Sequence, residues 1–345
     1  MAWTSRILAC PPQARAEALE LLYRRVPDAL RPYLIAEVLD EAERGLIDFS
    51  GLWIAVRGSA TLEPRPAADP NPLLRFMLAA PSGPQPGPII GAMLTQPLSP
   101  KTAAVWAPEV RPSWRRGATA SALVRMALAD LKARGFRLAQ AVLDETVPPH
   151  GSLDLARGGL PRVTELIYME RSTDLLLEPL QPGSSGNSSL TAWEWVPFCD
   201  ATEAEFRAVM QATYHDSLDM PELGGSRSLD DIIADHRAAF RFEPARWRLG
   251  RIPGDPESAA VVLLAEVEGR ELKSWEVVYL GLTPAARGRG LGRSVIAHAL
   301  ELASANAARL ELAVDVRNLP ALRLYESTGF TVVDRRVVHL AIFEA

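Results

Sequence analysis

A segment rich in glycine and arginine is the part of this sequence best suited to bind a ligand. It reads TPAARGRGLGR from Thr283 to Arg293 and joins a short aliphatic run to an amphipathic stretch. Gly288, Gly290 and Gly292 allow a tight turn and a close approach of the backbone to a ligand. The free amides and the dipole of a following helix favour phosphate oxygens. Three arginines add positive charge: Arg287, Arg289 and Arg293. The segment predicts a pyrophosphate-binding loop, although a glycine-rich turn flanked by solvated arginines has the same composition.

Better-known phosphate motifs do not fit this segment. Counted from Gly288, the third glycine of a GxGxxG fingerprint is replaced by Arg293, and no Gly-Lys pair exists for a Walker A loop. The chain also lacks GxSxG and HExxH. Dinucleotide binding, nucleotide hydrolysis and the simplest hydrolase chemistries are therefore disfavoured.

The elements around this loop predict an α/β (α+β) fold with a mixed, mostly antiparallel sheet flanked by helices. Apolar residues at spacings of three and four follow the loop at Val295, Ile296, Ala299, Leu300 and Ala303, which indicates a helix with one buried face. Similar patterns predict strands over residues 192–198, 247–252, 259–266, 277–282, 310–316, 330–336 and 338–343, and helices over residues 202–212, 229–240, 293–306 and 318–328.

The two halves of the chain resemble each other. The length of 345 residues suits about two domains of about 150 residues each. Sliding the sequence by 172 positions lays Pro112 on Pro284 and Arg115 on Arg287, and the match continues into the next helix and strand. A Pro-, Gly- and Ser-rich stretch separates the halves. We therefore expect tandem domains over residues 1–178 and 192–345, joined by a linker over 179–191, with long loops between residues 63 and 100.

Composition excludes several classes of protein. The net charge of −5 argues against nucleic-acid binding. Cys10 and Cys199 show neither disulfide nor metal-site spacing, so no metal is expected. The N-terminal residues lack the apolar core of a signal peptide, and the longest apolar run, Ala259–Ala265, is too short to span a membrane. A cytoplasmic protein without a membrane partner is expected.

The order of motifs in the second half resembles the GNAT superfamily of acyl-CoA-dependent N-acetyltransferases. The resemblance rests on a Pro, an RxxGxG loop, a helix, a strand and then a spaced set of residues. These residues are Pro284, Arg287, Gly290, Gly292, Asn318, Ala321, Leu324, Tyr325, Gly329 and Phe330. The family implies that the loop amides of Arg287, Gly288, Arg289, Gly290, Leu291 and Gly292, beside Arg293, hold the CoA pyrophosphate. It also implies that pantetheine lies between splayed strands ending near Leu282 and Val316.

The resemblance also implies catalytic roles. The backbone N–H of Leu282 would polarise the thioester carbonyl, and Tyr325 would protonate the departing thiolate, unless its ring only packs against the sheet. Glu276 stands eight residues before Pro284, where many family members carry a base, but it also fits a solvated strand entry; Asp315 is the second choice. Asn318 would contact pantetheine, cap a helix, or both.

The family builds its acceptor site from its first two helices and the loop between them. Here the polar residues of that region are Tyr214, His215, Asp216, Asp219, Glu222, Arg227 and His236, which could bind a polar cationic substrate or simply be solvated. The first half lacks the residues to which the resemblance assigns catalytic and CoA-binding roles. At the same offset Glu276 falls on Ala104, Gly290 on Ala118, Gly292 on Ala120 and Tyr325 on Leu153. Catalysis by the first half is not expected, and CoA binding by it stays open.

These features predict an enzyme that transfers an acetyl group from acetyl-CoA to a primary amine by direct attack in a ternary complex, as a monomer or homodimer. A small-molecule amine is favoured over a peptide amine as the acceptor. The alternative is a catalytically silent acyl-CoA sensor or interaction module; Glu276 and Tyr325, kept in one half only, favour the enzyme.

Overall fold

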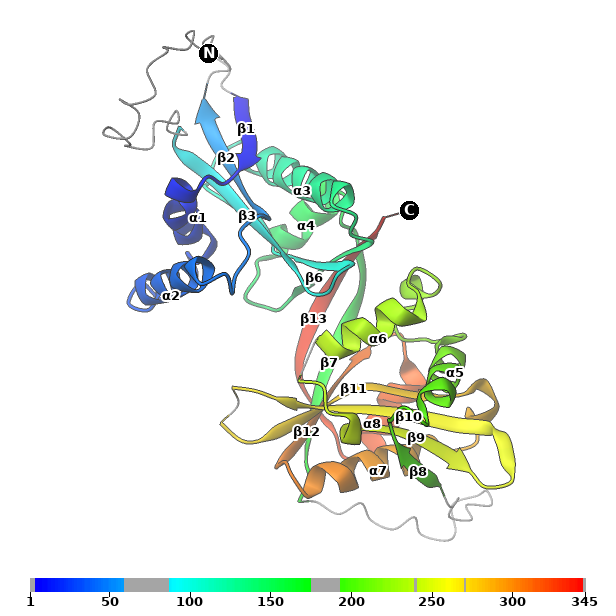
Figure 1. Ribbon diagram of the computed structural model, residues 1–345. Helices are drawn as coiled ribbons and strands as arrows, with labels where there is room; N and C mark the ends of the chain where they lie inside the picture. The colour runs from blue at the N-terminus through cyan, green and yellow to red at the C-terminus, as the bar shows by residue number, and fades with distance from the viewer. Residues whose placement is uncertain (1–3, 59–86, 175–192, 239–240, 270, 344–345) are drawn as a thin grey trace, which may run out of the picture. The chain divides into compact units, whose positions relative to one another are not determined.

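The computed structural model describes residues 4–58, 87–174, 193–238, 241–269 and 271–343 (Figure 1). These residues form two compact units. Unit 1 contains residues 1–96, 105–134 and 149–160, and unit 2 contains residues 97–104, 135–148 and 161–345. The expected linker over 179–191 lies outside the described residues.

Unit 1 is a small antiparallel sheet with helices. Strand β1 (Thr4–Ala9) pairs with β2 (Leu52–Gly58), β2 pairs with β3 (Ile89–Pro97), and the short β5 (Glu109–Val110) pairs with β3. Its helices are α1 (Arg15–Leu22), α2 (Arg31–Glu43), α3 (Arg116–Ala133) and α4 (Pro149–Gly158). Strand β3 lies in a stretch expected to be loop. That expectation was wrong because the prolines only border an apolar run that packs in the core.

Unit 2 is built on a longer mixed sheet in the order β4-β6-β13-β7-β12-β11-β10-β9-β8. Its strands are β4 (Thr102–Val105), β6 (Leu138–Leu143), β7 (Arg162–Ser172), β8 (Glu194–Pro197), β9 (Trp247–Ile252), β10 (Asp255–Val267), β11 (Ser274–Leu282), β12 (Arg309–Asp315) and β13 (Thr331–Ile342). Only the β11–β12 and β4–β6 pairs are parallel among the described pairs. The predicted mixed, mostly antiparallel sheet is confirmed.

Four helices cover the two faces of the second-half part of this sheet: α5 (Glu203–Tyr214), α6 (Leu229–Ala238), α7 (Gly292–Ser304) and α8 (Leu319–Ser327). On β10, Ala260, Val262 and Leu264 pack with α7, whereas Val261 and Leu263 pack with α5 and α6. Successive strand residues face opposite sides of a sheet. The unbroken apolar run of this strand therefore follows from burial on both faces.

The last strands of the two sequence halves are exchanged. Strand β7, from the first half, lies between β12 and β13 of the second half and pairs antiparallel with both. Strand β13 in turn pairs with β6 of the first half. The two closing strands predicted over residues 330–343 are one strand, because register shifts near Val332 and Val338 absorb the irregularity without ending the pairing.

Candidate functional site

The parallel strands β11 and β12 separate at their carboxyl ends. Their pairing runs from Ser274–Arg309 to Val277–Leu312, although β11 continues to Leu282 and β12 to Asp315. At the same point β11 bulges against β10, because Leu263 pairs with Tyr279 and Leu264 pairs with Val277. The backbone there is released from regular pairing, as the family resemblance implied for strands that admit an extended ligand.

The glycines of the loop after β11 have different structural roles. Gly288 and Gly290 have φ angles of 72° and 77°, and a Cβ atom added to either would meet no atom within 4 Å. At Gly292, the first residue of α7, an added Cβ would lie 2.8 Å from Cδ2 of Leu324. The first two glycines keep an open backbone just before the N-terminus of α7, a position that favours anions, whereas the third allows α8 to pack closely.

The loop arginines bind the chain itself. Arg287 donates from Nε to the Leu282 carbonyl at 3.1 Å, and from Nη2 and Nη1 to the carbonyls of Thr213 and His215, both at 2.7 Å. It thereby joins the C-terminal end of α5 to the end of β11. Arg289 pairs with Asp255 at 2.8 Å, and Arg293 donates to the Ser327 carbonyl at 3.1 Å. The sequence did not reveal these partners, which lie up to 74 residues away.

Tyr325 lies on α8 with its ring buried beside Phe330, at 5.8 Å between ring centroids. Burial raises the pKa of its phenol, and the charges of Asp219 and Tyr279 act in the same direction. Its phenol therefore stays protonated at neutral pH.

Asn318 caps α8 by accepting from the Ala321 amide at 3.3 Å, so the capping interpretation is confirmed.

Glu276 lies in β11 between Ala265 of β10 and Glu311 of β12. Its neighbours Trp275 and Val277 pack on the α7 side, so strand alternation places Glu276 on the face that α5 and α6 cover. Leu282 pairs with Ala260 at the end of β11. Asp315 is fully buried, and its carboxylate is occupied by internal hydrogen bonds. Those bonds argue against Asp315 as the base.

A cavity of about 290 Å³ lies beside the segment that joins α5 to α6, which we call the acceptor loop (residues 215–228). Of the residues predicted to bind an acceptor, four line the cavity: Tyr214, Asp216, Asp219 and Arg227. The exposed side chain of His215 instead pairs with Asp216 at 2.9 Å. Glu222 forms a two-point ion pair with Arg317.

Three aromatic side chains contact one another beside the acceptor loop: Tyr214, His236 and Tyr279. His236 Nε2 lies 3.0 Å from the Tyr214 hydroxyl, and the Tyr214 ring stacks on Tyr279 at 4.8 Å. Burial lowers the pKa of His236 to about 4, with the charge of Arg227 acting in the same direction. Burial also raises the pKa of Tyr279 to about 12. These rings are uncharged at neutral pH, and that of Tyr214 lines the cavity together with Asp219, whose own carboxyl pKa is raised.

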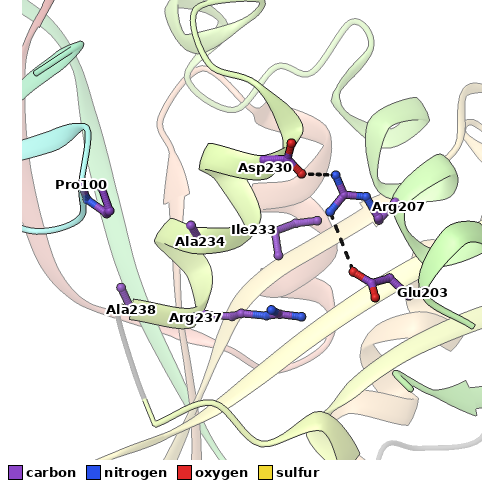
Figure 2. A pocket seen from close by; sticks show the side chains of 8 residues that line it. All are labelled: Pro100, Glu203, Arg207, Asp230, Ile233, Ala234, Arg237 and Ala238. Carbon is purple, nitrogen blue, oxygen red and sulfur yellow. Dashed lines mark hydrogen bonds and ion pairs between the residues drawn. The ribbon is translucent and has the colours of Figure 1, made fainter. Parts of the chain in front are cut away.

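A larger hollow of about 510 Å³ lies elsewhere in unit 2, between Pro100, α5 and α6 (Figure 2). Figure 2 shows that three of its charged residues pair, since Arg207 bonds Asp230 and approaches Glu203. None of the residues predicted to bind an acceptor lines this hollow, whereas several of them line the smaller cavity. We therefore place the candidate site at the smaller cavity.

The first half carries a different residue where α8 has its tyrosine. The Phe330 amide donates to the Tyr325 carbonyl at 3.0 Å, and the Leu160 amide donates to the Leu155 carbonyl at 2.9 Å. Leu155, and not Leu153, is therefore the counterpart of Tyr325. The simple offset was wrong by two residues because the loop before α4 (residues 144–148) is two residues longer than that before α8 (residues 316–318).

Comparison with known proteins identifies the class of the protein. The model of the acetyltransferase (GNAT) family matches residues 217–330. A GCN5-related N-acetyltransferase from Sphaerobacter thermophilus shares the fold over 98% of this chain and 95% of its own, with a TM-score of 0.53 and 17% sequence identity. That structural match covers both halves of the chain, in agreement with the tandem arrangement.

Two relatives are more similar in sequence. A mycothiol acetyltransferase of Mycobacterium leprae is 31% identical over 262 residues, which cover 71% of this chain and 76% of the relative. A mycothiol acetyltransferase of Corynebacterium kroppenstedtii is 30% identical over 259 residues, which cover 66% and 71%. The chain belongs to the GNAT acetyltransferase family and is an N-acetyltransferase. Its tandem arrangement of two GNAT-like halves resembles that of mycothiol synthase.

Proposed function

We propose that the protein transfers an acetyl group from acetyl-CoA to the primary amine of a small molecule, by direct attack within a ternary complex. GNAT acetyltransferases use acetyl-CoA as their co-substrate, and the main supporting observation is the open backbone at Gly288 and Gly290 before α7. Beside it lie separating strands, a buried tyrosine and a cavity with a carboxylate on its wall. When bound, acetyl-CoA supplies the activated acetyl group.

The residues of the chain divide the proton transfers between them. Glu276 removes a proton from the ammonium of the acceptor, directly or through water, and the resulting amine attacks the thioester carbon, so that the N–C bond forms and the C–S bond breaks. Tyr325 donates its phenolic proton to the departing thiolate and regains a proton from the nitrogen of the new amide. The Leu282 amide polarises the thioester carbonyl. Asp219 binds the cationic acceptor.

The acceptor is best sought among amines related to mycothiol, because relatives about 30% identical to this chain are mycothiol acetyltransferases. Deacetylated mycothiol is the first compound to test, followed by amino sugars and a peptide with a free N-terminus. A peptide acceptor fits the cavity of about 290 Å³ less well than a small amine.

The test is a rate measurement with the full chain, acetyl-CoA and each amine. The reaction is followed by the loss of thioester absorbance or by chromatography of the released CoA. Reagents that detect thiols are unsuitable, because mycothiol itself carries a thiol. We expect turnover with deacetylated mycothiol well above the rates with amino sugar and peptide. Acetyl-CoA binding without turnover on any amine would instead support an acyl-CoA sensor.

A further inference from the structure

We propose that Thr164, a residue of the first sequence half, positions the acceptor loop through the buried carboxylate of Asp315. Resting on the proposed function, this inference assigns to strand β7 a part in acceptor binding. Thr164, Asp315 and the acceptor loop all belong to unit 2.

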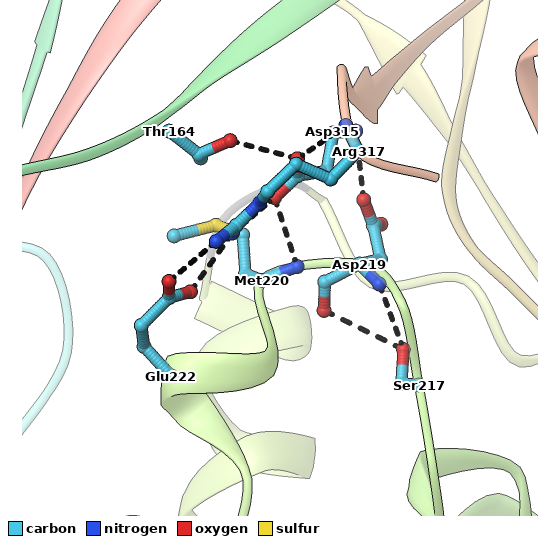
Figure 3. A network of polar contacts seen from close by, with 7 residues as sticks. All are labelled: Thr164, Ser217, Asp219, Met220, Glu222, Asp315 and Arg317. Atoms are coloured by element: carbon cyan, nitrogen blue, oxygen red, sulfur yellow. Dashed lines mark hydrogen bonds and ion pairs between the residues drawn. The ribbon is translucent and has the colours of Figure 1, made fainter. Parts of the chain in front are cut away.

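The centre of this arrangement is Asp315, the last residue of β12, which is completely buried (Figure 3). Its Oδ1 accepts from the Thr164 hydroxyl at 2.7 Å, and both carboxylate oxygens accept from the Arg317 side chain, at 3.0 Å and 2.7 Å. The Met220 amide donates to its Oδ2 at 3.2 Å. A buried carboxylate keeps a fixed orientation only when such donors saturate it.

The same residues hold the acceptor loop from several directions. The Asp219 carboxylate accepts from the Asp315 backbone N–H at 2.8 Å, so β12 and the loop bond each other reciprocally. Glu222 binds Arg317 at 2.6 Å and 2.9 Å. Met220 has a φ angle of 45°, a left-handed conformation that is unfavourable for a residue with a side chain. The loop therefore depends on these external bonds to keep this shape.

The shape of the loop determines where Asp219 points. Asp219 lines the cavity, and its charge raises the pKa of both Tyr325 and Tyr279. If the Thr164 hydroxyl is lost, the Asp315 carboxylate retains Arg317 but loses its side-chain hydrogen bond from β7. We expect the Asp315 carboxylate to rotate, the Met220 bond to weaken and Asp219 to lose its fixed position. Thr164 acts as a positioning residue, because it works through Asp315.

The test compares Thr164→Val with two controls in the full chain. Thr164→Ser keeps the hydroxyl, and Thr173→Val removes the hydroxyl of another buried threonine just beyond the end of β7, which bonds the Ala307 carbonyl. The first measurement is hydrogen–deuterium exchange of residues 216–224. We expect about tenfold faster exchange in Thr164→Val, as the loss of one hydrogen bond to a charged group implies, and no change in either control.

The second measurement is steady-state kinetics with acetyl-CoA and deacetylated mycothiol. We expect Thr164→Val to raise the KM for the amine about tenfold and the KM for acetyl-CoA less than twofold. Glu222→Gln, which weakens the exposed end of the network, should act in the same direction if Thr164→Val does not fold.

The outcomes separate this inference from the proposed function. Unchanged exchange in Thr164→Val, or equal changes in Thr173→Val, would overturn the positioning role. Faster exchange with an unchanged KM for the amine would overturn the link to acceptor binding. If the wild type acetylates no amine, the proposed function fails. Faster exchange in Thr164→Val would still show that Thr164 positions the acceptor loop.

Discussion

The role of Tyr325 depends on one oxygen atom. Its ring packs beside Phe330 and would do so equally as phenylalanine. If the phenol is the general acid, Tyr325→Phe should lower kcat by roughly 10²–10³, the usual range for acid–base catalysis, with little change in acetyl-CoA affinity. Steady-state kinetics and calorimetric titration measure the two effects.

A second, half-buried tyrosine is the control for this prediction. Tyr279→Phe removes a hydroxyl that bonds Thr213 at 2.9 Å, without removing the proposed acid. We expect it to lower kcat less than tenfold. Equal losses in the two variants would show that Tyr325 has a packing role.

His236 makes the acceptor-loop region sensitive to acid. Its neutral ring bonds Tyr214, and its pKa of about 4 in the folded state lies below the usual 6.5. The folded state binds the proton less tightly than the unfolded state, so the free energy of unfolding decreases as pH falls below about 6.5. Between pH 7 and pH 5 this group should remove about 2 kcal/mol.

The measurement is denaturant unfolding at both pH values, in the wild type and in His236→Gln. Glutamine can still bond Tyr214 but does not titrate, so the variant should lose less stability on acidification. An identical pH dependence in both proteins would contradict the assignment of this group.

Some site residues were predictable from sequence, and others were not. Gly290 and Tyr325 stand at fixed spacings within one loop and one helix, so local patterns reveal them. Arg287 has the charge of an anion ligand, yet its guanidinium bonds carbonyls at the end of α5. Such partners depend on the tertiary structure, which residue type and spacing do not encode.

At the scale of elements, the glycine loop and α7 allow two kinds of glycine variant to be distinguished. Gly290→Glu would place a negative side chain in the open space above the loop, at a strain of about 1 kcal/mol from its positive φ. We expect acetyl-CoA affinity to fall at least a hundredfold while the protein stays folded. Calorimetric titration and thermal unfolding decide this point.

Gly292→Val is the matched structural variant. Its side chain would collide with Leu324 and push α8 away from α7, so it should lower the unfolding temperature more than Gly290→Glu does. If Gly290→Glu bound acetyl-CoA normally in a folded protein, the loop would not be the pyrophosphate site.

Across the whole molecule, the repeat was visible in the sequence but the strand exchange was not. The offset of 172 relates equivalent residues, such as Arg115 and Arg287. It does not reveal which copy of a strand pairs with which neighbour, because equivalent strands carry similar apolar patterns. Pairing of β7 with β12 joins residues more than 130 positions apart. No local signal encodes that choice.

Among the helices that the structure describes, none has the length and apolarity of a membrane span.

The second half of the chain does not form a sheet by itself. Strand β7 bonds β12 from Arg309 to Asp315 on one edge and β13 on the other, so a fragment of residues 192–345 would lack the strand between them. Unpaired strand edges favour aggregation.

We therefore expect the fragment of residues 192–345 to aggregate on expression, and a fragment of residues 161–345, which keeps β7, to be more soluble. Size-exclusion chromatography, near-ultraviolet circular dichroism and acetyl-CoA titration compare the two fragments with the full chain. Both fragments lack β6, so the edge of β13 that pairs with β6 is unpaired in each. The two fragments differ in β7, and a difference in solubility therefore reports on that strand. A monomeric fragment of residues 192–345 with the acetyl-CoA affinity of the full chain would show that β13 can move beside β12 and replace β7. In that case Asp315 would have to keep the acceptor loop in place without Thr164.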